Sequence, residues 1–135
     1  MRYIKFRAWD LDDKKMIYPS ICFNEKYVLQ LNCEYAGQFN GKTYDTVKLP
    51  LMQFTGLTDK NGKEIYEFDI VEYYHNLHGS HIGGKGIAHI RYNDDFARWQ
   101  IAYKNIYEKE VWDDIDSKFL YVIGNIYENP ELLEK

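Results

Sequence analysis

The sequence is poor in several features that define large classes of protein. It has only two cysteines and three prolines among its 135 residues. Cys22 and Cys33 lie eleven positions apart without a Cys-x-x-Cys pair, so neither a disulfide framework nor a four-thiolate zinc site is expected. No apolar run reaches the roughly 18 residues of a membrane-spanning helix. Charged residues also interrupt the first ten positions, as a signal peptide would not. We therefore expect a soluble, cytoplasmic protein with no membrane partner.

Phosphate-binding loops and a strong charge of one sign are also absent. The sequence has no G-x-G-x-x-G loop, no Walker loop and no alternation of strands with helices, which argues against the common nucleotide-binding α/β folds. We expect no cofactor. The formal net charge of −4 repels phosphate on average and disfavours binding of nucleic acid through bulk charge.

Aromatic residues are abundant instead. The chain has 13 Tyr, 7 Phe and 3 Trp, and such rings pack well on the pleated surface of a sheet. The length fits one domain, residues 1–135. The composition therefore predicts a single, mainly β domain with a real core.

Alternating apolar and polar residues predict most of the strands. Residues 2–9 and 16–18 form a first hairpin in this interpretation, and residues 87–92 and 96–103 form another, with Trp99 and Ile101 in the core. Residues 26–31 fit either a strand or one helical turn. We expect these strands to pair as antiparallel sheets that curl into a small barrel or roll.

The last quarter of the chain gives three further predictions. Residues 111–116 are acidic and are predicted to be irregular. The continuous apolar run at residues 119–123 predicts a central strand covered on both faces. Asn129 followed by Pro130 is typical of a helix start, so a short C-terminal helix is expected.

The middle of the chain has the clearest local pattern. Asp59 and Gly62 are the turn residues of a hairpin, because Gly62 is free to adopt a left-handed conformation. Ile70 and Val71 then begin a buried strand.

One predicted strand face alternates rings with cations. Tyr3, Lys5, Arg7 and Trp9 share this face, an arrangement that lets bases stack while phosphates are neutralised. The alternative is a second buried face along which the Lys and Arg stems pack. The face is a candidate binding surface for single-stranded nucleic acid.

Two groups of residues are candidates for metal or acid–base chemistry. His75, His78 and His81 recur at every third position, but the glycines around them favour a solvated loop over a metal site. The acidic pairs Asp12-Asp13 and Asp94-Asp95, and the group at residues 113–116, lie where turns are expected. We assign no catalytic or metal-binding residue, and a metal-dependent hydrolase is the least favoured hypothesis.

Three segments resemble the YopX family of bacteriophage and prophage proteins. They are IKFRAWD (residues 4–10), LMQFTGLTDKNGKEIYEFDIV (residues 51–71) and VIGNIYENPELL (residues 122–133). The central segment is similar to the family motif F-T-G-L…D-x-x-G-x-x-I-Y-E-G-D-I-V. Phe68 stands where the family usually has Gly. A glycine at this position would permit a positive φ or a bulge. The motif residues, which we interpret as structural, are Phe54, Thr55, Gly56, Asp59, Gly62, Ile65, Tyr66 and Asp69.

The resemblance implies a fold and a setting but no activity. It implies a β-rich fold with an N-terminal β extension (residues 1–48) and an SH3-like barrel portion (residues 49–135), in a phage or prophage protein acting inside its bacterial host. The aromatic residues exceed what one small core can bury, and exposed rings are effective contact points. We therefore favour a non-enzymatic protein that binds itself as a homo-oligomer and a host or phage protein.

Overall fold

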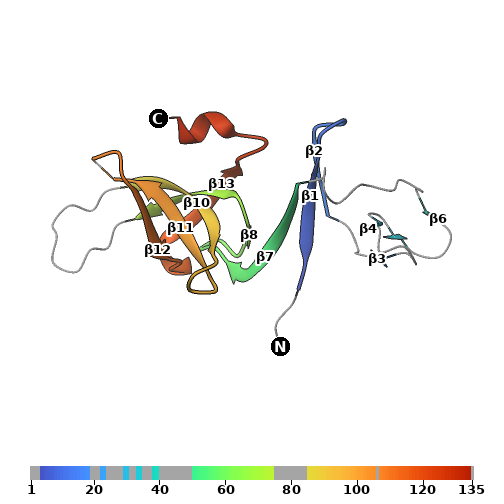
Figure 1. Cartoon of the computed structure of the whole chain (residues 1–135), viewed down its shortest axis with the longest axis horizontal. Helices are drawn as coiled ribbons and strands as arrows, with labels where there is room; N and C mark the ends of the chain where they lie inside the picture. The colour runs from blue at the N-terminus through green and yellow to red at the C-terminus, as the bar shows by residue number, and fades with distance from the viewer. Residues whose placement is uncertain are drawn as a thin grey trace. The chain divides into compact units, whose positions relative to one another are not determined.

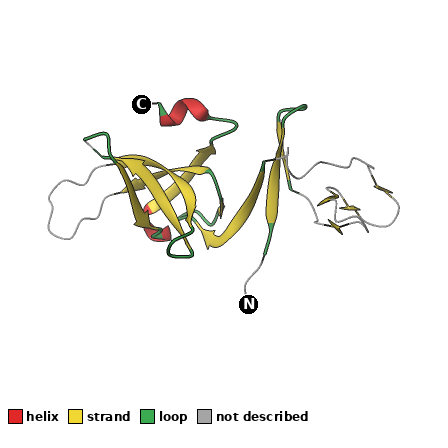
Figure 2. Cartoon of the chain, in the orientation of Figure 1, coloured by secondary structure: helices red, strands yellow, loops and turns green. Residues whose placement is uncertain are grey.

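Antiparallel strands make up most of the structure, a computed structural model that describes residues 4–18, 22–23, 29–30, 33–34, 38–39, 50–74, 85–105 and 107–134. Helical structure in these residues is limited to two 3-10 segments, η1 (Ser117–Phe119) and η2 (Pro130–Leu133) (Figure 2). The predicted mainly β, antiparallel class is confirmed. The chain divides into two compact units, Tyr3–Gln53 and Phe54–Lys135.

The first unit is built around a hairpin of β1 (Phe6–Asp10) and β2 (Lys15–Ile17). Ala8 faces Ile17 in this pairing, and both side chains are buried. The first three residues of β7 (Leu51–Thr58) pair with the other side of β1. Two short hairpins complete the described part of the unit: β3 (Cys22–Phe23) with β4 (Leu29–Gln30), and β5 (Cys33–Glu34) with β6 (Gln38–Phe39).

Asx turns without glycine close two of the hairpins. The Asp10 carboxylate accepts hydrogen bonds from the N–H groups of Asp12 and Asp13 at 3.0 and 3.1 Å, and Lys14 ends the turn with a φ of 52°. The turn after Asn93 repeats this arrangement, because the Asn93 side chain accepts from the Asp95 N–H at 3.0 Å. These acidic side chains are therefore turn residues, as predicted.

The second unit contains a five-stranded sheet that curls into a half-barrel (Figure 1). Its strand order is β12-β11-β10-β9-β13, with bounds β9 (Asp69–Tyr74), β10 (Lys85–Asn93), β11 (Arg98–Lys104), β12 (Glu110–Asp114) and β13 (Leu120–Asn125). The core lies on one face of this sheet and consists of Ile65, Val71, Tyr73, Ala88, Ile90, Ile101 and Leu120. Trp99 packs against it while partly buried. We call the opposite side of the sheet its outer face.

The motif segment forms the β7–β8 hairpin, with β8 at Glu64–Tyr66. Gly62 closes the turn at a φ of 82°, as predicted, and Gly56 has a φ of 86° where the register shifts. Thr55 Oγ1 donates to the Ile65 carbonyl at 2.8 Å. The Asp59 carboxylate accepts from the N–H groups of Asn61 and Lys63 at 2.8 and 2.9 Å. The remaining motif side chains are buried: Phe54, Ile65, Tyr66 and Asp69.

Phe68 occupies the left-handed region that a glycine would adopt, with a φ of 63°. Its N–H donates to the Ile90 carbonyl at 2.9 Å, and its carbonyl accepts from the Ile126 N–H at 3.1 Å. The Asp69 carboxylate also accepts from the Tyr66 N–H at 2.8 Å. These bonds hold a conformation that costs a non-glycine residue about 1–2 kcal/mol.

Two predictions for the end of the chain were wrong in their details. Residues predicted to be irregular form β12, because Asp113 accepts from Tyr103 Oη at 2.6 Å and Asp114 accepts from Gln100 Nε2 at 3.0 Å. Acidic side chains are rare in strands, but here both are hydrogen-bonded to β11. The apolar run forms β13, which lies at the edge of the sheet and not at its centre.

The expected C-terminal helix is only the 3-10 segment η2. Asn129 precedes it as predicted, but its side chain makes no capping hydrogen bond to the helix. The Asn129 side-chain oxygen instead accepts from the Asn125 N–H at 3.4 Å. A helix start without its cap loses about 1 kcal/mol.

Candidate functional site

The predicted ring-and-cation face of the first strand is largely buried. Arg7 and Trp9 are only 4% and 8% exposed, and Lys5 is exposed. Tyr3 lies outside the described residues. The structure therefore does not present Lys5, Arg7 and Trp9 as one exposed row, and the burial fits the alternative of a second packed face.

The three candidate metal-binding histidines, His75, His78 and His81, lie outside the described residues. Within the described ranges, no group of three or more His, Cys, Asp or Glu side chains is placed to hold a metal ion. None of the helical segments described has the length and apolarity to span a bilayer.

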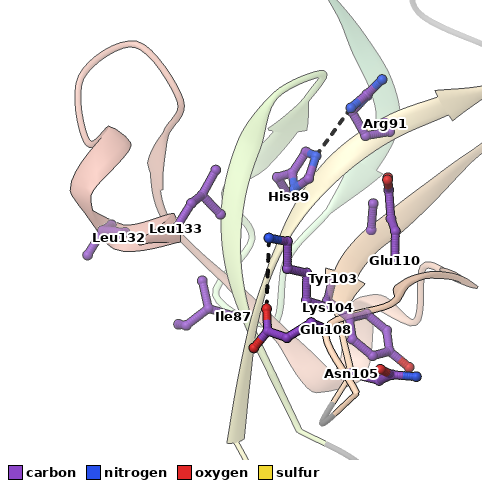
Figure 3. Close-up of a pocket in the computed structure, with 11 residues that line it drawn as sticks. Ile87, His89, Arg91, Tyr103, Lys104, Asn105, Glu108, Glu110, Leu132 and Leu133 are labelled. Carbon is purple, nitrogen blue, oxygen red and sulfur yellow. Dashed lines mark hydrogen bonds and ion pairs between the residues drawn. The ribbon is translucent and has the colours of Figure 1, made fainter. Parts of the chain in front are cut away.

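A pocket of about 320 Å³ lies on the outer face of the half-barrel (Figure 3). Ile87, His89 and Arg91 point to this face because they alternate along β10 with the buried residues Ala88 and Ile90. The volume falls at the lower end of the range for small-ligand sites, roughly 300–1,000 Å³. The other lining residues are Ala102, Tyr103, Lys104, Asn105, Glu108, Glu110, Leu132 and Leu133.

The pocket has one apolar side and one ionic side. Leu132 and Leu133 of η2 lie with Ile87 on the apolar side (Figure 3). On the ionic side, Lys104 Nζ lies 3.9 Å from a carboxylate oxygen of Glu108. A ligand that enters can therefore bury an apolar group and pair a charged group at the same time.

Arg91 is fixed in place by rings and by a histidine. Its guanidinium carbon lies 5.4 Å from the centre of the Trp112 ring and 5.8 Å from that of Phe68, within cation–π range. Arg91 Nη1 also lies 3.4 Å from His89 Nε2. Arginine has no acceptor, so this contact requires a histidine whose Nε2 carries no proton.

The surroundings of His89 favour its neutral form. Burial lowers the pKa of His89, and the charge of Arg91 lowers it further, while Glu110 acts in the opposite direction. Glu110 itself accepts from the Trp112 indole N–H at 2.9 Å. A negative group arriving beside His89 would favour the protonated ring.

The sequence pattern did not identify this pocket. In the sequence, His89 and Arg91 are simply the polar positions of an alternating strand. The residues that line the pocket with them include Glu108 on a turn and Leu133 in η2, which are distant in the sequence. No local signal in the sequence marks the pocket. The unusual backbone of Glu108, with a φ of 59° where Gly or Asn is usual, is seen only in the structure.

A second cluster on the same unit combines rings with lysines. The Tyr74 and Tyr121 rings meet edge to face with centres 5.9 Å apart. Lys60 Nζ lies 5.8 Å from the Tyr121 ring centre, and Lys85 Nζ lies 5.6 Å from that of Tyr74. Lys85 is also paired with Glu72 at 3.4 Å.

Comparisons with known proteins found a family and a solved structure that each match nearly the whole chain. The family model described as YopX protein matches residues 5–134. Among solved structures, the crystal structure of a protein from Enterococcus faecalis is similar, with 28% sequence identity and a TM-score of 0.60. That similarity covers 98% of this chain and 99% of the other. No curated protein matches the chain.

Proposed function

Since the chain belongs to the YopX protein family, we propose that it is a phage- or prophage-encoded, non-enzymatic domain that binds a short segment of a partner protein. The resemblance of its motifs to phage and prophage proteins supports the setting, inside the cytoplasm of a bacterial host. The similarity to a bacterial structure over 98% of the chain is consistent with that setting.

The observation that carries the binding role is the two-sided lining of the outer-face pocket. Ile87, Leu132 and Leu133 offer an apolar wall opposite side chains of both charge signs. A polypeptide segment presents this combination, because apolar and charged side chains follow one another along an extended backbone.

The pocket is also preorganised for binding. His89 and Arg91 project from the central strand of the sheet, and the Arg91 guanidinium lies within cation–π distance of both the Trp112 and Phe68 rings. Side chains that are already ordered lose less entropy on binding.

Selection from a displayed library of random peptides tests this function. We expect the immobilised protein to enrich a related group of peptides. A Lys104→Glu and Leu133→Asp double variant should lose them, because it changes both walls of the pocket. Lys118→Glu is the matched control, since Lys118 is exposed and does not line the pocket. Enrichment that is absent, or that the double variant retains, would contradict the proposal.

Self-association is part of the same proposal, because a second copy of the chain is itself a protein partner. Phe96 and Tyr107 are exposed rings on turns of the second unit, at 67% and 75% exposure. Light scattering over a concentration series tests this part. We expect the apparent mass to rise with concentration, and a strict monomer throughout would remove it.

A second candidate function is binding of single-stranded nucleic acid at the Tyr74–Tyr121 cluster. Rings flanked by lysines provide stacking surfaces and phosphate contacts together. The net charge of −4 ranks this function second. Fluorescence anisotropy with labelled oligonucleotides should show binding that weakens with salt and with Tyr121→Ala. Absence of binding, or binding indifferent to salt, would exclude it.

A further inference from the structure

The pocket already contains an internal carboxylate at the place where a ligand group would bind. Glu108 reaches Lys104 at 3.9 Å across the turn between β11 and β12. Both side chains are largely exposed, at 72% for Lys104 and 83% for Glu108. An exposed ion pair of this length is weak and readily exchanged.

The turn backbone presents Glu108 in an unusual conformation. The Asn105 side chain accepts from the N–H groups of Tyr107 and Lys109 at 2.9 and 3.0 Å, and the Glu108 N–H donates to the Asn105 carbonyl at 3.0 Å. These bonds hold Glu108 at its φ of 59°. The turn thus carries a carboxylate where a glycine would be easier to accommodate.

We propose that the ligand of the pocket is a peptide segment with a carboxylate next to an apolar side chain, and that this carboxylate displaces Glu108 from Lys104. This inference rests on the proposed function and specifies its ligand. The apolar side chain packs on Ile87, Leu132 and Leu133, while the carboxylate lies within reach of Lys104 and His89 (Figure 3).

Charge around the pocket supports an anionic ligand. Glu110 faces Lys104 across the β11–β12 pair, but its carboxylate is hydrogen-bonded to Trp112. The charged groups among the lining residues are Lys104, Arg91 and the two glutamates. Displacement of Glu108 leaves Lys104 and Arg91 without an ion-pair partner among the residues that the structure describes. A carboxylate then favours protonation of His89, so binding takes up a proton and strengthens as the pH falls.

Two acetylated and amidated dipeptides provide the probe, Leu-Glu and its uncharged twin Leu-Gln. Dissociation constants from NMR titration should be about tenfold lower for Leu-Glu, the difference that a charge-assisted hydrogen bond provides. Affinity for Leu-Glu should rise from about pH 7.5 to about pH 5.5, by up to tenfold for each unit by which binding raises the pKa of His89.

Opposite effects of two variants make the test specific. Glu108→Gln should tighten Leu-Glu binding severalfold, because the competing carboxylate is removed. Glu108→Gly should also tighten it, and this variant relieves the strain of the positive φ in the turn as well. Lys104→Gln should weaken binding about tenfold. Lys118→Gln should leave it unchanged.

Several outcomes would overturn the inference. The inference is wrong if Leu-Glu and Leu-Gln bind with equal affinity, if Leu-Glu does not bind, or if Glu108→Gln binds Leu-Glu more weakly. It is also wrong if inorganic phosphate binds to the pocket and neither dipeptide does. If the library selection still enriches peptides that need the pocket, the proposed function stands and only the ligand chemistry is wrong. If that selection also fails, the proposed function fails as well.

Discussion

The carboxylate of Asp59 accepts a hydrogen bond of 2.9 Å from the backbone N–H of Val122, a residue 63 positions further along the chain. The same carboxylate accepts from two N–H groups of its own turn. Lys60 adds a backbone bond of 3.1 Å to the Leu120 carbonyl. One motif side chain thus fixes the β7–β8 turn and attaches it to the edge strand β13.

Asp59→Ala should destabilise the protein by roughly 2–4 kcal/mol, because three backbone N–H groups, of Asn61, Lys63 and Val122, lose their acceptor. Asp59→Asn should cost less, since it keeps one acceptor oxygen. Chemical denaturation measures both values. Asp116→Ala is the control, because Asp116 accepts a single exposed bond of 3.2 Å from the Lys118 N–H. Equal effects of Asp59→Ala and Asp116→Ala would contradict the role assigned to Asp59.

Phe68 combines a strained backbone with a ring in two contacts. Phe68→Ala removes the ring from Tyr127, whose centre lies 6.3 Å away, and from Arg91, but it keeps the positive φ. Phe68→Gly removes both the ring and the strain. The glycine variant should therefore be the more stable of the two by about 1 kcal/mol. Thermal unfolding of the pair tests this, and an alanine variant at least as stable would show that the strain is absent.

Stability should decline in mild acid through His89. Its folded pKa is lowered from the ordinary 6.5, so the unfolded chain takes up a proton before the folded chain does. The contribution to stability is complete above about pH 6.5 and is lost as the pH falls through that value towards the lower folded pKa. His89→Gln should flatten this part of the profile of unfolding temperature against pH. An unchanged slope would show that His89 does not contribute.

Alkaline pH should act on the core tyrosines. Burial, and then the charge of Asp113, raises the pKa of Tyr73 to about 12. Burial, and then the hydrogen bond to Asp113, also raises the pKa of Tyr103. Their contribution to stability is present below the ordinary value of 10.0 and is lost as the pH rises through about 12.

Tyr73→Phe should therefore reduce the loss of stability above pH 10.0. Tyr107→Phe is the control, because Tyr107 is 75% exposed. Unfolding free energies at several alkaline pH values give the comparison. A profile that Tyr73→Phe leaves unchanged would contradict burial of the Tyr73 hydroxyl.

Local sequence patterns predicted the strands in which apolar and polar residues alternate. Ala88 and Ile90 alternate with His89 and Arg91, and the structure places the first pair in the core. Gly62 was predicted from its turn chemistry, and its φ of 82° confirms it. The β12 strand was missed because Asp113 and Asp114 are poor strand formers whose hydrogen bonds come from another strand.

Local sequence patterns could not predict the pocket, for a similar reason. His89, Glu108 and Leu133 are brought together only when the sheet curls and the end of the chain returns across its outer face. β13 likewise read as a central strand, because five consecutive apolar residues carry no information on which neighbours a strand will have. Positive φ at Phe68 and Glu108 is set by surrounding hydrogen bonds, which no spacing in the sequence indicates.

Intermolecular nuclear Overhauser effects between a library-selected peptide and the isotope-labelled protein test the central claim most directly. The account predicts contacts from the bound peptide to the methyl groups of Ile87, Leu132 and Leu133, together with shifts at His89 and Lys104. Contacts confined to Tyr74 and Tyr121, or a peptide that leaves all these signals unchanged, would contradict it.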